Sequence, residues 1–477
     1  MLPLYNVKQK ETFEQVLIGS ELNEYQRRQA LSLLREYSDI FSDVPKVTNM
    51  IEHRIQLIEQ EPVRCKMYPL PYKLQETIDN EIKDMESMKI VEGSEAAYSS
   101  PLVIVKKADG SNRVCVNFKK LNSITVFDPE PMMSADDIFP KLSGSRFYSK
   151  FDFLKGYWQI PMAEDSKDYT SFATTGGLRR FRVMPFGLVN AGSTYNRMMR
   201  KMLQGSHNLE SYLDDVLGYT RTWEEHLKIL KDFFDRVRRA NLSLKPSKCQ
   251  IGFTKVEFLG HTLTGDTIEP RSAALDKILE ASRPNTKKQV RALLGMVGFY
   301  RKFIPDCSTL TAPLSDLTAK RCSNKVNWGD EQEQAFIKLR QLLSRSPILK
   351  LPDLNRPFVL QTDASNLGIS GVLLQEHEGV KHPVAYASRK LLSRECNYTV
   401  GERECLAVVW AVQKFSRFLT DNEFVLETDH RPLECLNSGN TTNPRVMRWG
   451  LALQCFRFSV RYIPGVDNVL ADCLSRV

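Results

Sequence analysis

Two stretches of the chain carry aspartates in settings that call for a chemical partner. Asp152 interrupts the aromatic and apolar run RFYSKFDFLKGYWQI, and NLESYLDDVLGY places Asp214 and Asp215 between two strand-like segments. An unpaired carboxylate in an apolar run loses its hydration or takes up a proton, so Asp152 needs a partner. Asp-Asp alone is most often a surface turn. Three gathered carboxylates repel one another, however, and Mg²⁺, which prefers oxygen ligands, would offset that repulsion.

A pair of Mg²⁺ ions at such a site supports one kind of reaction. Ions about 3.5–4 Å apart activate an attacking hydroxyl and stabilise the leaving oxygen of an in-line phosphoryl displacement. The three aspartates therefore indicate nucleotidyl transfer.

A second set of carboxylates lies later in the sequence. FVLQTD, which ends at Asp363, is echoed by FVLETD, which ends at Asp429, and each is an apolar strand pattern that delivers an aspartate at its end. One such strand is ordinary, because aspartate often begins a turn. Two in one small region predict carboxylates gathered at the edge of a sheet.

The pattern also predicts the elements that position these residues. PLVIVKKADGSNRVCVNF predicts a β-hairpin with a basic tip, and residues 147–219 alternate strand-like and helical stretches. Apolar periodicity predicts helices over residues 20–42, 74–89, 224–240 and 331–344.

A basic helix is expected after Thr286, which forms a capping-box pattern with Gln289; Pro305 would end the helix. Residues 283–302 contain six basic residues and no acidic one. Most charge runs are solvated faces, but a helix of one sign over this length favours contact with phosphates.

Length and composition indicate a globular chain of several domains. At about 150 residues per domain, 477 residues predict roughly three, and 42% hydrophobic residues are enough to bury their cores. We expect no membrane span, because no window holds the ~18 consecutive apolar residues required, and no signal peptide. The 10 cysteines include no C-x-x-C pair, which disfavours zinc knuckles and disulfide frameworks and predicts an intracellular, reducing compartment. A net charge of +9 permits nucleic acid as a partner without requiring it.

Several motifs together carry a family resemblance. Tyr212-Leu213-Asp214-Asp215 resembles the Y-x-D-D box of reverse transcriptases, and Asp152 matches the upstream aspartate of their palm. VIVKKADGSNRVCVNFKKLN, FDFLKGYWQI, RRFRVMPFGLVNAGSTYNRMM, LKPSKC and VEFLGHTL resemble, in order, blocks of the polymerase of gypsy-type long-terminal-repeat retrotransposons. The blocks cover most of residues 50–270, and their order is far more specific than any four-residue box.

The resemblance implies a role for each matching residue. Asp152, Asp214 and Asp215 would be catalytic and hold the metal ions, with help from the carbonyl of Phe153. The matching nucleotide-binding residues are Lys106, Lys107, Arg113, Tyr157 and Phe186. Those matching the template-primer contacts are Phe258, Leu259, Gly260 and His261 in the primer-holding hairpin and Lys287, Lys288 and Arg291 in the thumb.

Two positions depart from the family pattern. The family commonly has Asp where Asn117 stands and Pro where Gly192 stands. Neither departure removes a metal ligand, so we expect an effect on efficiency rather than on the kind of activity.

Beyond residue 350 the sequence resembles the ribonuclease H domain of the same elements. The matching acids are Asp363, Glu404, Asp429 and Asp472, which would bind Mg²⁺ and activate water against an RNA phosphodiester. Glu402 is a rival for the place of Glu404, which directly precedes the Leu-Ala spacing of the family. We expect His430 to make a turn contact rather than act as a base. Some ribonucleases H carry a histidine before the last aspartate, where this chain has YIPG.

The resemblance implies an α+β multidomain chain, with a right-hand polymerase of fingers, palm and thumb followed by an α/β ribonuclease H-like domain with a mixed sheet. We expect a lead-in segment at 1–50, fingers and palm at 51–270, the thumb at 271–325, a tether at 326–350 and the ribonuclease H domain at 351–477.

The expected cofactor is Mg²⁺, two ions per active site, for which Mn²⁺ can substitute. The expected partners are RNA and DNA template-primers, RNA/DNA hybrids and deoxynucleoside triphosphates. The chain resembles the middle of a longer polyprotein, which in an active element would reside in a cytoplasmic particle.

The leading hypothesis is an RNA-directed DNA polymerase that also copies DNA and has ribonuclease H activity. The alternative is an inactive, nucleic-acid-binding relic of a retroelement, which would have no use for seven acids in like-charged clusters. A host-type reverse transcriptase such as telomerase is disfavoured by the ribonuclease H motifs. The sequence leaves the oligomeric state open.

Overall fold

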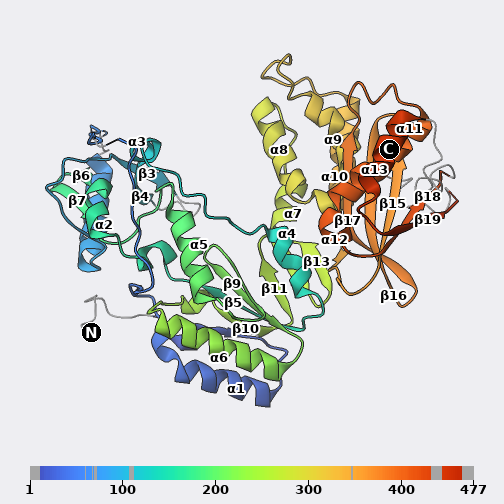
Figure 1. Cartoon of the computed structure of the whole chain (residues 1–477). Coiled ribbons are helices and arrows are strands. Elements are labelled where there is room, and N and C mark those ends of the chain that lie inside the picture. Colours follow the sequence, from blue (N-terminus) through green and yellow to red (C-terminus); the bar gives the residue numbers. More distant parts are fainter. Residues whose placement is uncertain are drawn as a thin grey trace. The chain divides into compact units, whose positions relative to one another are not determined.

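The computed structural model describes residues 11–59, 61–66, 68, 72–106, 112–344, 348–430 and 443–464. The chain divides into two compact units: the first comprises residues 1–138 and 145–256, and the second comprises residues 139–144 and 257–477. Figure 1 labels many of the elements of each unit.

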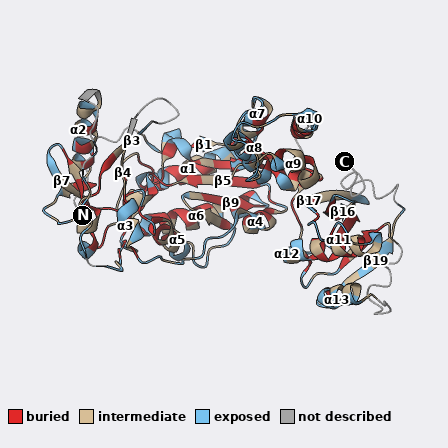
Figure 2. Ribbon diagram, turned by 90° about the horizontal axis from the view of Figure 1, so that it is seen from above, coloured by how far each residue is buried: buried red, intermediate tan, exposed pale blue. Residues whose placement is uncertain are grey.

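The first unit is built on a five-stranded sheet, here called the Asp152 sheet, whose strands lie in the order β1-β10-β5-β9-β8. Central β5 pairs antiparallel with β9 and β10, so the sheet joins segments far apart in sequence. Apolar residues of these strands and of the helices α1, α5 and α6 form one buried core (Figure 2). The bounds are β1 Leu17–Ile18, β5 Phe147–Asp152, β8 Leu209–Tyr212, β9 Asp215–Thr220, β10 Gln250–Phe253, α1 Glu24–Glu36, α5 Ala191–Met202 and α6 Trp223–Arg239.

The sequence determines where these helices begin. α6 starts at a capping box in which Thr222 accepts from the backbone N–H of Glu225, and α1 starts in the same way at Asn23. α1 is shorter than expected: it ends at Glu36, because the chain turns at Tyr37 into a short 3-10 segment. The buried face of α6 then packs on β9 and α1.

Smaller elements complete the first unit. A three-stranded sheet runs β2-β7-β6, and β3 and β4 form the predicted hairpin, whose tip lies outside the described residues. The bounds are β2 Val91–Gly93, β3 Leu102–Lys106, β4 Asn112–Val116, β6 Phe172–Thr174, β7 Gly177–Phe181, α2 Tyr72–Ser87, α3 Lys119–Ser123 and α4 Ala135–Ile138.

The second unit begins with a four-stranded sheet in the order β11-β12-β13-β14 and a group of helices. The predicted basic helix is present as α8, capped by Thr286 and Gln289. The bounds are β11 Lys255–Phe258, β12 His261–Thr264, β13 Thr267–Pro270, β14 Leu349–Lys350, α7 Ser272–Leu279, α8 Lys287–Phe299, α9 Cys307–Asp316 and α10 Asp330–Ser344.

The rest of the second unit contains a five-stranded mixed sheet, here called the Asp363 sheet, in the order β17-β16-β15-β18-β19. β15 pairs antiparallel with β16 but parallel with β18, and β18 pairs parallel with β19. α11 packs on β15 and β16, where its apolar side meets Phe358 and Leu360. The bounds are β15 Phe358–Ala364, β16 Gly368–His377, β17 Val380–Lys390, β18 Phe424–Thr428, β19 Phe458–Tyr462, α11 Val400–Lys414, α12 Ser416–Leu419 and α13 Pro444–Leu453.

The mixed sheet confirms the fold expected for the C-terminal domain. The finer boundaries at residues 50, 270, 325 and 350 remain predictions. None of the described helices combines the length and the hydropathy that crossing a membrane requires.

Candidate active sites

The first candidate site lies where β5 ends and the β8–β9 hairpin turns. Asp152 is the last residue of β5 and stands opposite Asp215, the first residue of β9, in the antiparallel register. Asp214 lies in the two-residue turn between β8 and β9, which requires Leu213 to adopt a φ of +53°. The expected hairpin tip is thus present, and it brings the three predicted aspartates to one edge of the Asp152 sheet.

Two lysines neutralise part of this acidic edge. The Nζ of Lys150 lies 3.2 Å from a carboxylate oxygen of Asp215, and the Nζ of Lys248 lies 3.0 Å from one of Asp152. Burial raises the pKa of Asp215 despite Lys150, and the charges of Asp214 and Asp152 add to the rise. Burial alone would lower the pKa of Lys248, but the hydrogen bond to Asp152 and the other two carboxylates raise it overall. These shifts are those of a negative site that attracts cations.

Sequence reasoning gave neither lysine a role. Lys248 lies in LKPSKC and Lys150 two residues before Asp152. The alternation of a strand could have indicated Lys150, because residues two apart share a face of the sheet.

Aromatic side chains surround the predicted sugar contact. The ring of Tyr157 stacks on Phe186 at 5.2 Å and meets Tyr195 at 5.4 Å between centroids. Tyr195 is fully buried, and burial together with Asp214 and Asp152 holds the pKa of its hydroxyl well above the usual range. Gly156 allows this packing, because a Cβ there would lie 2.8 Å from the Tyr195 ring. The sequence motif contained Tyr195 but did not indicate its buttressing position.

The other predicted nucleotide contacts are placed less completely. Lys106 ends β3 and Arg113 lies in β4, so both belong to one hairpin. Lys107 lies outside the described residues. Phe186 keeps 38% of its surface exposed and lines, with Trp158 and Lys155, a cavity of about 350 Å³.

The predicted primer-holding hairpin is present as β11–β12. Leu259 and Gly260 form its turn, both with positive φ, and a Cβ on Gly260 would press on the Phe299 ring at 3.1 Å. Phe258 and His261 are buried, and His261 packs among Phe299 and other aromatic rings of the second unit. Of the four predicted residues, Leu259 and Gly260 are therefore the partly exposed ones.

The basic residues of α8 differ in their surroundings. The Nζ of Lys287 donates to the carbonyl of Ala319 at 2.8 Å, and Arg291 donates to that of Thr318 at 3.2 Å. Lys288 is exposed on the helix surface. Two of the three predicted thumb contacts thus also hold the segment that follows α9.

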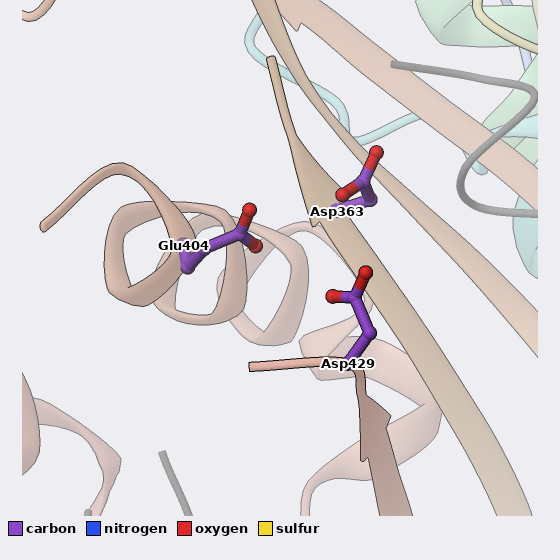
Figure 3. A group of neighbouring side chains, drawn as sticks. All are labelled: Asp363, Glu404 and Asp429. Carbon is purple, nitrogen blue, oxygen red and sulfur yellow. The ribbon is translucent and has the colours of Figure 1, made fainter. Parts of the chain in front are cut away.

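The second candidate site gathers Asp363, Glu404 and Asp429. Within the described part of the chain this is the group of metal-ligand side chains whose oxygens all lie within 4.8 Å of one another. Figure 3 shows Glu404 reaching from α11 toward Asp363 on β15 and Asp429, which directly follows β18. The echoed strand ends and the helix therefore meet as the sequence predicts.

The electrostatics of this cluster fit a divalent cation. Burial raises the pKa of Glu404 to about 9, and the charges of Asp363 and Asp429 contribute. One carboxylate oxygen of Glu404 is buried and makes no hydrogen bond within the described residues. A hard cation would turn this repulsion into attraction and satisfy the buried oxygen.

Neighbouring residues have other partners. Glu402 closes the capping box of α11 with Thr399 and forms an ion pair with Arg445 at 2.6 Å. It therefore lies apart from the carboxylate cluster. His430 borders the first turn of α11, where a Cβ on Gly401 would lie 3.4 Å from its ring. Asp472 lies outside the described residues.

Family comparisons match both regions. The family described as "Reverse transcriptase (RNA-dependent DNA polymerase)" matches residues 105–263, and "RNase H-like domain found in reverse transcriptase" matches residues 353–456.

Curated relatives extend the similarity over nearly the whole chain. The Retrovirus-related Pol polyprotein from transposon 297 of Drosophila melanogaster is 36% identical over 438 residues, which are 90% of this chain and 41% of that protein. The polyprotein of transposon 412 from the same organism is 33% identical, covering 94% and 37%. The Transposon Tf2-3 polyprotein of Schizosaccharomyces pombe is 31% identical, covering 93% and 34%. The chain thus spans less than half the length of these relatives.

Solved structures share the fold. A foamy viral protease-reverse transcriptase in complex with double-stranded DNA has a TM-score of 0.84 at 22% identity, covering 93% of this chain and 94% of that one. The same type of protein in complex with an RNA/DNA hybrid has a TM-score of 0.78 at 20% identity, covering 99% and 65%. The fold is therefore that of a retroviral-type reverse transcriptase followed by an RNase H-like domain. The chain carries a reverse transcriptase domain and an RNase H-like domain, as found in the Pol polyproteins of long-terminal-repeat retrotransposons.

Proposed function

We propose that the chain copies RNA and DNA templates into DNA and cleaves the RNA of RNA/DNA hybrids, at two separate sites that each use two Mg²⁺ ions. The observation that carries the polymerase assignment is the register of Asp152 opposite Asp215, with Asp214 in the adjoining turn. The one that supports ribonuclease H is the cluster of buried Asp363, buried Glu404 and half-buried Asp429. Mn²⁺ is expected to substitute for Mg²⁺ at both.

At the first site, Asp152, Asp214 and Asp215 would hold the metal ions, with the carbonyl of Phe153. Bound Mg²⁺ supplies the Lewis acid that activates the primer hydroxyl and stabilises the leaving pyrophosphate. The carboxylates fix where those charges sit. Lys150 and Lys248 hold Asp215 and Asp152 in place and limit their mutual repulsion.

Substrate selection falls to the fingers and to the aromatic stack. Lys106, Lys107 and Arg113 would bind the triphosphate, where a guanidinium can pair two phosphate oxygens. Phe186 would lie beside the incoming nucleotide, and Tyr157, stacked on it, would contact the sugar.

The hairpin turn and α8 would hold the template-primer. Leu259 and Gly260 form the partly exposed turn of the hairpin, while the buried Phe258 and His261 fix its position. Lys288 is exposed to a phosphate on α8, and Lys287 and Arg291 add positive charge beside it. The foamy viral relatives were solved in complex with double-stranded DNA and with an RNA/DNA hybrid, which supports both as ligands.

At the second site, Asp363, Glu404 and Asp429, with Asp472, would hold the ions that activate water against the RNA phosphodiester. The burial of Asp363 and Glu404 strengthens their interaction with a cation, because solvent screening is weak there.

We place the thumb at 271–325, the tether at 326–350 and the ribonuclease H domain at 351–477. We place the active element in an intracellular particle.

Primer extension on a 5′-labelled RNA template tests this function. With Mg²⁺ and deoxynucleotides we expect DNA product and shortened RNA, and neither after chelation with EDTA. Tight binding of the template-primer without extension or cleavage would instead support an inactive relic.

A further inference from the structure

The echoed strands FVLQTD and FVLETD are neighbours in space. β15 and β18 pair in parallel from Phe358 opposite Phe424 to Gln361 opposite Glu427, so the first four residues of one motif face their counterparts in the other. The only difference between the motifs is this Gln/Glu pair. It lies two residues before Asp363 and Asp429, which bear the carboxylates of the second site.

The pair makes a buried polar contact. The Nε2 of Gln361 donates to a carboxylate oxygen of Glu427 at 2.8 Å, and Gln361 and Glu427 are 4% and 0% exposed. The Nζ of Lys381 on β17 lies 2.7 Å from the same carboxylate, and Arg461 on β19 lies 3.4 Å from it. The contact therefore bridges strands on both sides of β15 and β18.

Apolar patterning alone does not fix the register of these strands. A shift of one residue would move each apolar side chain to the wrong face, but a shift of two would keep every side chain on its face. Such a shift would displace Asp429 along Asp363 by about 6.6 Å, beyond the 4.8 Å that the cluster allows. It would also place buried Glu427 opposite Val359 instead of Gln361, which strongly disfavours it because a buried charge needs partners.

We propose that Gln361 and Glu427 form a positioning pair. The pair fixes the position of Asp363 relative to Asp429 along the strand direction and thereby sets metal affinity at the second site. This inference rests on the proposed function only in taking that cluster to be the metal site. Groups that orient metal ligands typically change affinity 10–100-fold when removed.

Calorimetric titration with Mn²⁺ tests the pair without requiring turnover. The full chain carries Asp152→Asn and Asp214→Asn to suppress ion binding at the first site. Gln361→Leu should weaken Mn²⁺ binding at the second site about tenfold or more. Glu427→Gln preserves an acceptor for the amide of Gln361. Its Mn²⁺ affinity should therefore stay within about threefold of the parent, a difference of less than about 0.7 kcal/mol.

Gln375 on β16 provides the matched control. It is also a fully buried glutamine, but it lies opposite Phe358 at the other end of β15 and bonds the backbone of Asp353. Gln375→Leu should lower the melting temperature as Gln361→Leu does, yet leave Mn²⁺ affinity unchanged.

The outcomes separate the two proposals. Unchanged Mn²⁺ affinity in Gln361→Leu, or equal losses in Gln361→Leu and Gln375→Leu, overturns the positioning pair whether or not the parent cleaves hybrids. A loss in Glu427→Gln as large as in Gln361→Leu also overturns it. If the variants change Mn²⁺ affinity as predicted but the parent cleaves no hybrid, the positioning pair stands and the proposed ribonuclease activity is overturned. A parent that binds no Mn²⁺ there overturns both.

Discussion

Tyr157 illustrates how one side chain gains a function from its packing. Two neighbouring rings, those of Phe186 and Tyr195, limit its movement. A ribonucleotide differs from a deoxynucleotide by the 2′-hydroxyl, and an apolar pocket rejects an added hydroxyl by only ~10²-fold. Stronger rejection of the ribonucleotide requires a ring that packing holds rigidly in place.

Tyr157→Ala should therefore increase ribonucleotide incorporation about tenfold or more, a loss of about 1.4 kcal/mol in discrimination. Single-nucleotide insertion with each nucleotide type measures the ratio, and cleavage of a preformed hybrid provides the internal control. Normal polymerisation with undiminished discrimination would show that Tyr157 is an ordinary core aromatic.

Alanine substitutions at the two glycines near this ring should change the stability of the protein in opposite directions. A Cβ on Gly156 would lie 2.8 Å from buried Tyr195, whereas one on Gly192 would lie 3.8 Å from the Tyr157 hydroxyl, an ordinary contact. Gly156→Ala should cost about 1–3 kcal/mol through overpacking. Gly192→Ala should stabilise α5 by about 0.5–1 kcal/mol, because alanine favours helix. Thermal unfolding of the two variants checks the contrast, and equal effects would contradict it.

α6 is anchored to the Asp152 sheet through a buried histidine. The ring nitrogens of His226 lie 2.7 Å from the hydroxyl of Ser149 and 2.9 Å from that of Thr220, and burial lowers its pKa from 6.5 to about 3. The neutral ring therefore belongs to the folded state.

Acid should loosen this element. Below pH 6.5 His226 binds a proton in the unfolded chain, whereas in the folded chain it stays neutral down to about pH 3. The free energy of unfolding is therefore highest above pH 6.5 and decreases as the pH drops from 6.5 to about 3. The slope from this one residue is at most about 1.4 kcal/mol per pH unit. Urea unfolding from pH 7 to 5 measures it. His226→Gln should flatten the dependence, and an unchanged slope would show that other groups dominate.

The surroundings of α8 predict a division of labour among its basic residues. Lys288→Ala should reduce the slope of log affinity against log salt by about 0.9 for one lost phosphate contact on a B-form duplex. Lys287→Ala should mainly lower the melting temperature, because Lys287 holds the carbonyl of Ala319. Template-primer binding across a salt series distinguishes the two. An unchanged slope in Lys288→Ala would mean that its side of the helix is only solvated.

Sequence patterns predicted the elements of the molecule better than their side-chain partners. The capping box at Thr286, the hairpin at Asp214 and the two strands ending at Asp363 and Asp429 are local features, and local rules were enough to find them. The register that pairs Gln361 with Glu427 could not be predicted, because it depends on strands that are 66 residues apart. The same holds for Lys248, which reaches Asp152 across 96 residues.

As a whole, the molecule places its two acidic sites in different compact units, Asp152, Asp214 and Asp215 in the first and Asp363, Glu404 and Asp429 in the second. The aspartates of each set lie at or beside the strand ends of one sheet. The central claim is that these are two independent active sites.

The most direct test measures DNA synthesis and RNA cleavage in one reaction for the parent, Asp214→Asn and Asp363→Asn. We predict that Asp214→Asn abolishes synthesis and still cleaves a preformed hybrid, that Asp363→Asn does the reverse, and that both still bind template-primer. Loss of both activities from either substitution, in a protein whose circular dichroism matches the parent, would contradict the account.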